Sequence, residues 1–365
     1  MRSRAILSTL QWSAFLLLTL GLALKLAQLL RGGLLNPNFG YIHIAYNWLL
    51  GIYPTALYLL ALLFGLLGIL LKPGGVRPLG FALFCFALGS LFFGLRYYVT
   101  HVEPERLRIH RVEFISDKIA SPLRIIHISD THFPKWGDYE RRVLQTLENL
   151  NADLIIHSGD FVQAVEPATF AEIWQQFIHA LSDIRQPKYG IYGVFGDTDW
   201  DIHRLPVLKR KPIQLLSSSN QIIHTQAGTL DLFGLNLSQS RYPEWGLRAI
   251  NRWLESSPDG VFRIAIGHAP DFAMELESSP IDLIVAGHTH GGQVRLPKLG
   301  PLVIDSDVPM EWSMGLRRIG VPFLNVSAGA GSNRFEGLPP IRFGCPTEIT
   351  VFDLIPSTAI SPSSN

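Results

Sequence analysis

Seven acidic and imidazole side chains stand at or just after the ends of apolar runs, where they could bind metal ions. The runs LRIIHISD and ADLIIHSGD end at Asp130 and Asp160, and YGIYGVFGD ends at Asp197. Two later runs, FRIAIGH and IDLIVAGHTH, end in histidines. A single Asp after a strand is usually a turn or a helix cap, but five such endings in one chain indicate a shared site. Its candidate ligands are Asp130, His132, Asp160, Asp197, His268, His288 and His290.

The composition of this set indicates two metal ions. Carboxylates that are crowded together repel one another, so one of them stays protonated unless a cation compensates the charge. Asp and His ligands without Cys suit Mn²⁺, Fe or Zn²⁺, whereas Ca²⁺ prefers oxygen ligands alone. Seven ligands are more than one such ion needs. Two neighbouring ions that share a carboxylate would use all seven, and could clamp the attacking and leaving oxygens of a displacement at phosphorus.

The elements that must position these side chains are strands of an α/β domain. Continuous apolar runs of this length predict strands that are buried on both faces of a sheet. Between the runs, residues 138–150, 169–184 and 245–256 carry apolar side chains at helical spacing. The alternation of strand and helix predicts parallel pairing, and ligands then gather at the carboxyl ends of the strands.

Five sequence blocks, all in order, resemble the calcineurin-like metallophosphoesterases. They are D-x-H at 130–132, G-D at 159–160, G-D-T-D at 196–199, G-H at 267–268 and G-H-T-H at 287–290. The stretch GHTHGGQVRLP and a later Gly-rich segment are similar to the membrane-associated branch of the family, which includes enzymes similar to the UDP-2,3-diacylglucosamine pyrophosphatases of lipid A synthesis. The resemblance spans residues 122–355 and implies a β-sandwich flanked by helices.

The resemblance also implies how the ligands divide between the two ions. One ion would be held by Asp130, His132 and His290. The second would be held by Asp197, His268 and His288, and Asp160 would bridge both. A hydroxide between the ions would attack phosphorus, because metal binding makes water acidic enough to ionise near neutral pH.

The third block departs from the family pattern G-N-H-[DE]. Asp197 stands for the Asn, which keeps an oxygen ligand but adds a negative charge. Thr198 stands for the catalytic histidine, and Asp199 is the acidic residue that assists it, so these two are the candidate catalytic residues. Threonine is too weak an acid to protonate a leaving group near neutral pH. We therefore expect pyrophosphate-type substrates to be cleaved where simple alkyl phosphodiesters are not.

Five further residues are candidates for supporting roles. Arg334 is the candidate substrate-binding residue, because a guanidinium suits bidentate recognition of phosphate, and Arg342 lies in the same Gly/Pro-rich segment. His127 and His157 each stand three residues before a motif Asp. They either orient metal ligands or pack in the core. His203 follows the G-D-T-D block closely and is a weaker candidate for the site.

The first hundred residues form a separate apolar segment, which raises the hydrophobic share of the chain to 47%. Runs at 5–30, 48–71 and 79–99 each have the roughly 20 residues that a helix needs to cross a bilayer. A cleavable signal peptide is disfavoured, because no small-residue cleavage site follows the first run and two more runs come after it. We expect a membrane anchor of three helices over 1–100.

Charge and composition define the remaining parts of the chain. Residues 101–121 are a predicted polar connector, and 356–365 a disordered tail rich in Ser and Pro. A net charge of +1 argues against a nucleic-acid partner, and two cysteines exclude a disulfide framework. The distribution of Arg and Lys around the spans favours a cytoplasmic catalytic domain on a multi-pass protein of the bacterial cell membrane.

These features predict a membrane-anchored two-metal phosphoesterase that hydrolyses a phosphodiester or pyrophosphate bond. A lipid-linked or membrane-borne substrate is expected, because an enzyme that acts on soluble substrates does not need three membrane spans. One alternative is a phosphodiesterase for a soluble, nucleotide-like substrate. Another is a membrane protein whose metal-binding domain senses a ligand with low or no turnover.

Overall fold

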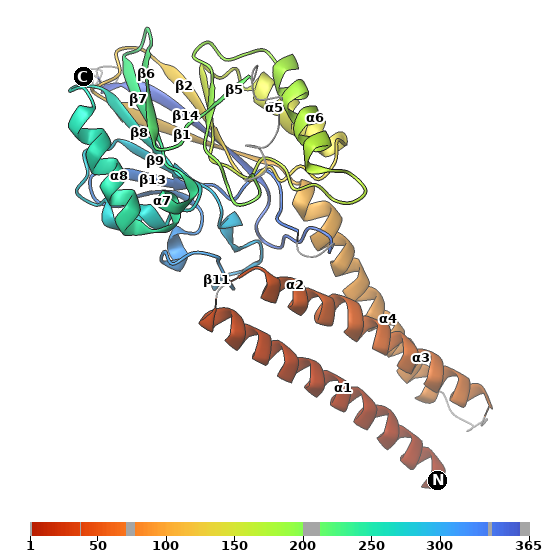
Figure 1. The fold of residues 1–365 in the computed structure, drawn as a ribbon. Coiled ribbons are helices and arrows are strands. Elements are labelled where there is room, and N and C mark those ends of the chain that lie inside the picture. The colour runs from red at the N-terminus through yellow and green to blue at the C-terminus, as the bar shows by residue number, and fades with distance from the viewer. Residues whose placement is uncertain (1, 37, 71–76, 200–211, 335–337, 358–365) are drawn as a thin grey trace, which may run out of the picture. The chain divides into compact units, whose positions relative to one another are not determined.

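The computed structural model describes residues 2–36, 38–70, 77–199, 212–334 and 338–357 (Figure 1). The chain divides into two compact units, Met1–Val102 and Glu103–Asn365. The division falls at the end of the apolar segment, where charged residues become frequent.

The first unit is helical. An apolar core joins its three long helices through Leu22 of α1, Leu57 of α3 and Phe81 of α4. The second helix is continuous from α2 through a π-helical turn into α3. The elements are α1 (Arg2–Leu35), α2 (Gly40–Asn47), η1 (Trp48–Ile52), α3 (Tyr53–Leu70), α4 (Arg77–Tyr97) and η2 (Tyr98–Val102).

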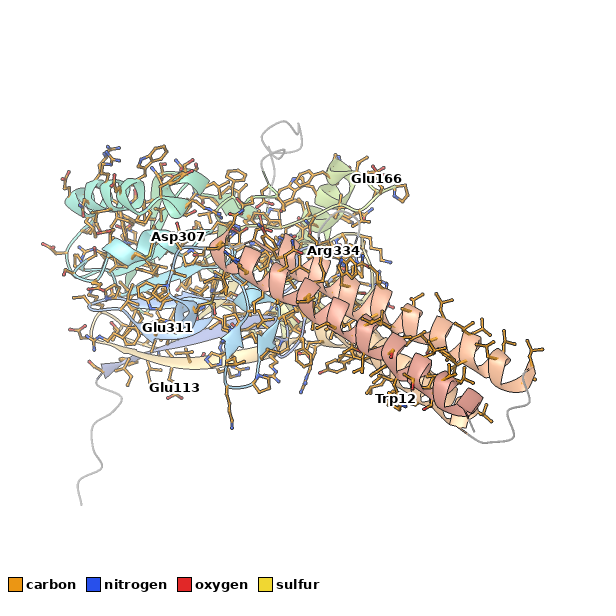
Figure 2. All side chains as sticks on the ribbon, turned by 90° about the horizontal axis from the view of Figure 1, so that it is seen from below. Trp12, Glu113, Glu166, Asp307, Glu311 and Arg334 are labelled. Atoms are coloured by element: carbon orange, nitrogen blue, oxygen red, sulfur yellow. The ribbon has the colours of Figure 1, made fainter. Side chains whose placement is uncertain are left out.

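Three helical stretches in the described residues are long and apolar enough to cross a membrane. They are Ile6–Leu35, Gly40–Leu70 and Pro78–Glu105. Helices cover the described part of each predicted span, and the second begins at Gly40 rather than at residue 48. Large apolar side chains are exposed on these helices, among them Leu17 and Trp12 of α1; Trp12 is labelled in Figure 2. Such a surface is compatible with insertion into lipid.

The second unit contains two mixed sheets of six strands each. The first sheet has the order β1-β14-β2-β3-β4-β5, with parallel pairing from β2 to β5 and antiparallel pairing of β14 with β2. Its strands are β1 (Arg108–Ser116), β2 (Leu123–Ile128), β3 (Leu154–His157), β4 (Ile191–Gly193), β5 (Ile213–Leu215) and β14 (Glu348–Pro356).

The second sheet has the order β12-β13-β9-β8-β7-β6, in which β13, β9, β8 and β7 are parallel. Its strands are β6 (Ser219–His224), β7 (Thr229–Gly234), β8 (Phe262–Ile266), β9 (Leu283–Ala286), β12 (Gly315–Arg318) and β13 (Phe323–Val326). A small hairpin pairs β10 (Arg295–Leu296) with β11 (Gly300–Pro301).

Helices cover the outer face of each sheet (Figure 1). The helices predicted at 138–150, 169–184 and 245–256 are confirmed. Short 3₁₀ turns accompany these helices in the described residues. The helical elements are α5 (Asp138–Asn149), α6 (Phe170–Asp183), α7 (Leu237–Arg241), α8 (Pro243–Ser256), η3 (Glu103–Glu105), η6 (Asp271–Glu275), η7 (His290–Gly292) and η8 (Met310–Trp312).

Strand alternation explains why the sequence shows continuous apolar runs. In β2, Ile125 points into the core between the sheets, where it joins Ile264 of β8. The next residue, Ile126, points outward to Val143 of α5 and Trp174 of α6. Since successive side chains of a strand face opposite ways, both faces of β2 require apolar residues. The predicted β-sandwich flanked by helices is confirmed.

The segment predicted as a polar connector, 101–121, contains strand β1. Arg108 to Ser116 pair in parallel with β14 over nine residue positions, at the edge of the first sheet. The strand is polar because it has a neighbour on one side only: its first four residues are all exposed, and covered positions alternate with exposed ones only from Val112 onward. Its Phe114 is buried between the sheets, so the globular unit begins well before residue 122. Residues 358–365 of the expected tail lie outside the described residues.

Candidate metal centre

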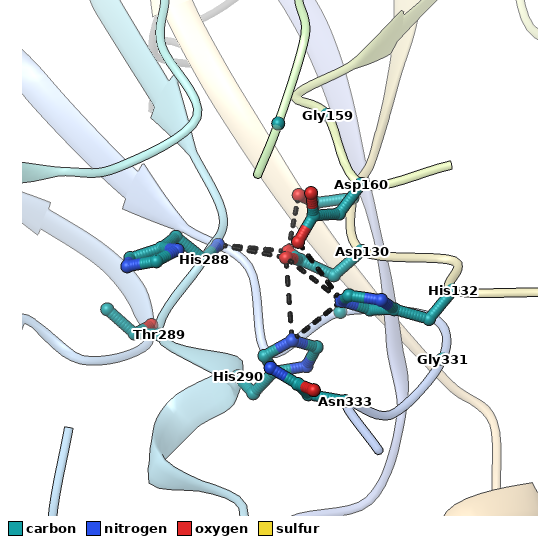
Figure 3. A network of polar contacts seen from close by, with 12 residues as sticks. Asp130, His132, Gly159, Asp160, His288, Thr289, His290, Gly331 and Asn333 are labelled. Carbon is teal, nitrogen blue, oxygen red and sulfur yellow. Dashed lines mark hydrogen bonds and ion pairs between the residues drawn. The ribbon is translucent and has the colours of Figure 1, made fainter. Parts of the chain in front are cut away.

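All seven predicted ligands meet at the carboxyl ends of five parallel strands. Asp130, Asp160 and Asp197 follow β2, β3 and β4 of the first sheet. His268 follows β8, and His288 follows β9 of the second sheet. Candidate ligand atoms lie within 4.8 Å of one another in three overlapping groups: Asp130, His132 and His290; Asp197, His268 and His288; and Asp130, Asp160 and His268. The spatial convergence predicted from the strand ends is therefore present, and Figure 3 labels Asp130, His132, Asp160, His288 and His290.

Five of the seven residues have a left-handed backbone. The φ angles are 48° at Asp130, 40° at His132, 58° at Asp160, 67° at His288 and 49° at His290. Each such position costs about 1–3 kcal/mol in a residue other than glycine and persists only where the surroundings enforce it. The concentration of strained positions at the ligands indicates that the fold holds these side chains in place for a function.

Asp160 lies between the two halves of the cluster. Its Oδ2 atom is 3.2 Å from His132 Nε2 and 3.4 Å from His268 Nε2. Its other oxygen, Oδ1, accepts hydrogen bonds from Thr198 N at 2.8 Å and from Thr198 Oγ1 at 3.2 Å. A Cβ at Gly196 would collide with this carboxylate, which explains the glycine of the G-D-T-D block. One oxygen of Asp160 thus faces both candidate ion positions.

The remaining ligands form one group on each side of Asp160. On one side, His132 Nε2 is 3.0 Å from His290 Nε2, which is 3.6 Å from Asp130 Oδ1. On the other, Asp197 Oδ2 is 2.8 Å from His288 Nδ1 and 3.5 Å from His268 Nε2. Nitrogen and carboxylate oxygen atoms at these separations could close around a divalent ion after small side-chain shifts.

His268 directs its Nε2 atom at the cluster. Its Nδ1 atom is 2.8 Å from the carbonyl oxygen of Ser158, which can only accept, so Nδ1 carries the ring proton. An ion bound at Nε2 would require the neutral ring, in which this nitrogen has a lone pair. Without an ion, burial opposes protonation, but Asp160 and Asp197 outweigh it and raise the pKa of His268 well above its usual value. The Nε2 atom is buried, has no hydrogen-bond partner and faces Asp160 and Asp197. A buried, unpaired nitrogen directed at two carboxylates fits a metal ion.

The electrostatics of the centre favour added positive charge beside Asp130. Burial opposes ionisation of Asp160, but His268 and His132 outweigh it and hold the pKa of this carboxyl well below its usual range. At Asp130 burial dominates, and the pKa is raised. The pKa values of two carboxyl groups in one buried cluster are thus shifted in opposite directions. Two divalent ions would supply the charge that allows both to ionise.

The two candidate catalytic residues both contact the Asp160 loop. Asp199 is buried, and its carboxylate accepts from the backbone N–H groups of Asp160 (2.7 Å), Phe161 (2.9 Å) and Gly196 (2.8 Å). Burial, with Asp160 nearby, raises the pKa of Asp199 to about 7, while the three N–H groups favour its ionised form. Asp199 joins the β3 and β4 loops, and Thr198 orients Asp160. This geometry gives both residues a positioning role.

A chain of buried hydrogen bonds leads from the core to Asp130. Asn325 Nδ2 lies 2.9 Å from His127 Nδ1, and since the amide N–H donates, His127 Nε2 carries the ring proton. His127 Nε2 then donates to Ser158 Oγ (2.9 Å), Ser158 to Ser129 Oγ (2.7 Å), and Ser129 to Asp130 Oδ2 (2.5 Å). The amide of Asn325 therefore sets the direction of every donor as far as Asp130, a predicted metal ligand.

The other supporting candidates have mostly structural surroundings. His157 stacks on Phe161, with ring centroids 4.0 Å apart, and its Nδ1 accepts from Gly159 N. Arg342 is fully buried and donates to the carbonyl oxygens of Ala328 and Gly331, so it supports the loop after β13. Its Nη2 also lies 3.3 Å from Nδ1 of His290, a predicted metal ligand. His203 lies outside the described residues.

Arg334, the predicted substrate-binding residue, is hydrogen-bonded to the loop that carries His132, a predicted metal ligand. Its Nη1 donates to the carbonyl oxygen of His132 at 3.4 Å, and its backbone N–H donates to Gln163 Oε1 at 2.9 Å. The residue is labelled in Figure 2. Its contact with substrate stays a prediction.

Sequence reasoning did not identify Arg241 as a site residue. This residue ends α7, 47 positions before His288 in the chain, and its guanidinium nevertheless contacts the His288 ring and Asp305. Arg241 belongs to none of the five motif blocks. No local pattern in SRYPEW distinguishes it from an ordinary surface arginine.

The family comparison agrees with this geometry. Residues 123–292, which include all seven ligands, match the family model of the calcineurin-like phosphoesterases. The chain carries a calcineurin-like metallophosphoesterase domain. Divalent metal binding is normal in this family, and hydrolase activity is supported.

Three relatives illustrate the range of the family. The metallophosphoesterase YkuE of Bacillus subtilis is 27% identical over 73% of this chain and 93% of its own length. The phosphodiesterase YaeI of Escherichia coli is 26% identical over 71% of this chain and 92% of its own. The UDP-2,3-diacylglucosamine pyrophosphatase LpxG of Chlamydia trachomatis is 24% identical over 55% of this chain and 74% of its own.

Proposed function

We propose that this protein is a membrane-anchored phosphoesterase that binds two divalent ions and hydrolyses a phosphodiester or pyrophosphate bond of a lipid-linked or membrane-borne substrate. The observation that carries the proposal is the position of Asp160 Oδ2, within 3.4 Å of a histidine nitrogen on each side. A carboxylate oxygen placed in this way suits a ligand that two ions share. Mn²⁺, Fe or Zn²⁺ would suit the donor set.

Each side chain has a defined task in this proposal. Asp130, His132 and His290 would hold one ion, and Asp197, His268 and His288 the other. Two ions, when bound, would polarise the phosphoryl oxygens and make water a stronger acid. Thr198 and Asp199 keep Asp160 and the β4 loop in position, so that the carboxylate stays aimed between the ions.

The substrate class is supported by three features. Three apolar helices would place the catalytic unit beside a bilayer, where a substrate with acyl chains resides. LpxG, a relative, is named for a diacylated sugar nucleotide. A pyrophosphate leaving group also needs little protonation, which suits a centre that has Thr198 where the family has histidine.

Turnover by the full chain in detergent tests this proposal. The enzyme is loaded with Mn²⁺ and given UDP-2,3-diacylglucosamine or an activated aryl phosphodiester. We expect metal-dependent hydrolysis of the diacylated substrate that is lost in Asp160→Ala and retained in Asp138→Ala, a fully exposed carboxylate on α5. Hydrolysis of the soluble diester alone would favour the nucleotide-like alternative. No turnover of either with both ions bound would favour a sensor.

A further inference from the structure

The strongest feature outside the seven ligands is the guanidinium of Arg241. Its Nη1 contacts His288 Nε2, and its Nη2 donates to Asp305 Oδ1 at 3.1 Å. Arg241 therefore lies directly behind a ligand of the second ion position. Arg342 makes a comparable contact with the other group, where its Nη2 lies 3.3 Å from His290 Nδ1, but Arg342 is fully buried.

The backbone around Arg241 is anchored to the metal centre. Helix α7 begins with a capping box between Asn236 and Gln239. Ser240, the residue before Arg241, is fully buried, and its hydroxyl accepts from the backbone N–H of Ala269, next to His268. The placement of Arg241 is therefore linked to the loop that supplies a ligand.

Asp305 is also held in place. The buried carboxylate of Asp271 accepts from Ser306 Oγ at 2.8 Å and from the backbone N–H of Asp307 at 2.9 Å. These two bonds fix the short segment that carries Asp305. Asp305 can thus act as a stationary anion that retains Nη2 of Arg241 while Nη1 moves.

Proton positions on His288 decide what Nη1 of Arg241 can do. The Nδ1 atom of His288 lies 2.8 Å from Asp197 Oδ2 and is the ring atom that faces the cluster. An ion bound at Nδ1 leaves the ring proton on Nε2. An N–H group cannot accept from a guanidinium, which has donors only. Metal binding at His288 is therefore incompatible with the Arg241 contact, and Nη1 is released.

The released donors lie on the open side of the centre. The side chains of Asp197 and Arg241 are 43% and 37% exposed, whereas those of the other six ligands are buried. A phosphate group that reaches the centre from this exposed side would pass Asp197 and Arg241. The guanidinium has a planar set of donors that matches phosphate oxygens, and it would offset the negative charge of Asp197 and of the phosphate.

We propose that Arg241 is a substrate-binding residue that binds a non-bridging phosphate oxygen after metal loading, with Asp305 as its tether. The inference rests on the proposed two-metal site. In this inference, the phosphate group that contacts Arg241 lies beside the second ion, next to Asp197. Arg241 would therefore strengthen phosphate binding and weaken metal binding, because the ion must displace its contact with His288.

Calorimetry on the full chain in detergent separates these two effects. Mn²⁺ is titrated first, and inorganic phosphate is then titrated into the Mn²⁺-loaded protein. For Arg241→Met we expect phosphate affinity to fall at least about tenfold, as for loss of a charge-assisted contact, while Mn²⁺ binds as tightly as before or more tightly. Arg241→Lys should keep part of the phosphate affinity. Arg248→Met, an exposed arginine on α8, is the matched control and should change neither.

Three results would overturn the assignment: unchanged phosphate affinity in Arg241→Met, joint loss of Mn²⁺ and phosphate affinity in that variant, or no phosphate binding by the loaded wild-type protein. The joint loss would mean that Arg241 merely orders His288. Because the titrations involve no turnover, phosphate binding through Arg241 without ester hydrolysis would contradict the proposed function and support the assignment.

Discussion

Thr198 shows how one residue connects the geometry with substrate choice. Its hydroxyl and its backbone N–H both donate to Asp160 Oδ1, so this position supports the shared carboxylate and offers no strong acid. We expect the wild-type enzyme to cleave aryl or pyrophosphate esters far faster than alkyl phosphodiesters. Thr198→His should reduce this difference, because an imidazole can protonate an alkoxide leaving group.

Steady-state rates on a matched aryl and alkyl pair measure this effect. Thr198→Ser keeps the hydroxyl and serves as the control, with the wild-type ratio of rates. Equal rates on both esters in the wild type would contradict the prediction.

His127 gives the globular unit a specific sensitivity to acid. Burial lowers the pKa of His127 to about 3, whereas an unfolded histidine has a pKa of about 6.5. Between these values the unfolded chain binds a proton that the folded chain does not, so the free energy of unfolding falls as the pH falls. From pH 6.5 to pH 5 this residue should cost about 2 kcal/mol.

Urea unfolding of the full chain with a chelator present, at pH 7 and pH 5, tests this effect. His127→Gln should lose less stability on acidification than the wild type. His179→Gln, an exposed histidine on α6, should behave like the wild type. The same pH dependence in all three proteins would disprove the role of His127.

At the scale of elements, strand β1 is part of the core and not a linker. Phe114 packs edge-on against Phe262 and Phe323 of the second sheet, at centroid distances of 5.6 and 4.9 Å. Phe114→Ala should destabilise the globular unit by about 3 kcal/mol, as deletion of a buried aromatic ring does. Ile115, the next residue on the strand, is 50% exposed, and Ile115→Ala should have little effect. Urea unfolding compares the two variants, and equal losses would support the connector interpretation.

The contrast between β1 and the ligand strands shows what the sequence can predict. Asp130 and Asp160 each follow a strand that is covered on both faces, so a continuous apolar run predicts both the strand and the candidate ligand after it. The edge strand β1 has no such run, because its outer positions face solvent. Arg241 could not be predicted because its role depends on a contact with His288, 47 residues away, that no local pattern encodes.

At the scale of the whole molecule, membrane attachment by the apolar helices and the side of the membrane on which the catalytic unit lies are two separate predictions. We expect the protein to stay with the membrane fraction after alkaline carbonate washing, since three long apolar helices match the length of a bilayer. The balance of positive residues around the spans favours a cytoplasmic catalytic unit. Protease added to intact spheroplasts should then leave this unit whole, and cleave it only after permeabilisation. Cleavage in intact spheroplasts would place the unit on the other side.

The two-ion centre is the central claim, and metal stoichiometry tests it most directly. The full chain in detergent is titrated with Mn²⁺, and bound metal is counted by mass spectrometry after removal of free ions. We predict two ions per chain in the wild type and no more than one in Asp160→Ala, because Asp160 Oδ2 faces both positions. A single ion in the wild type, or two ions bound as tightly by Asp160→Ala, would contradict the account.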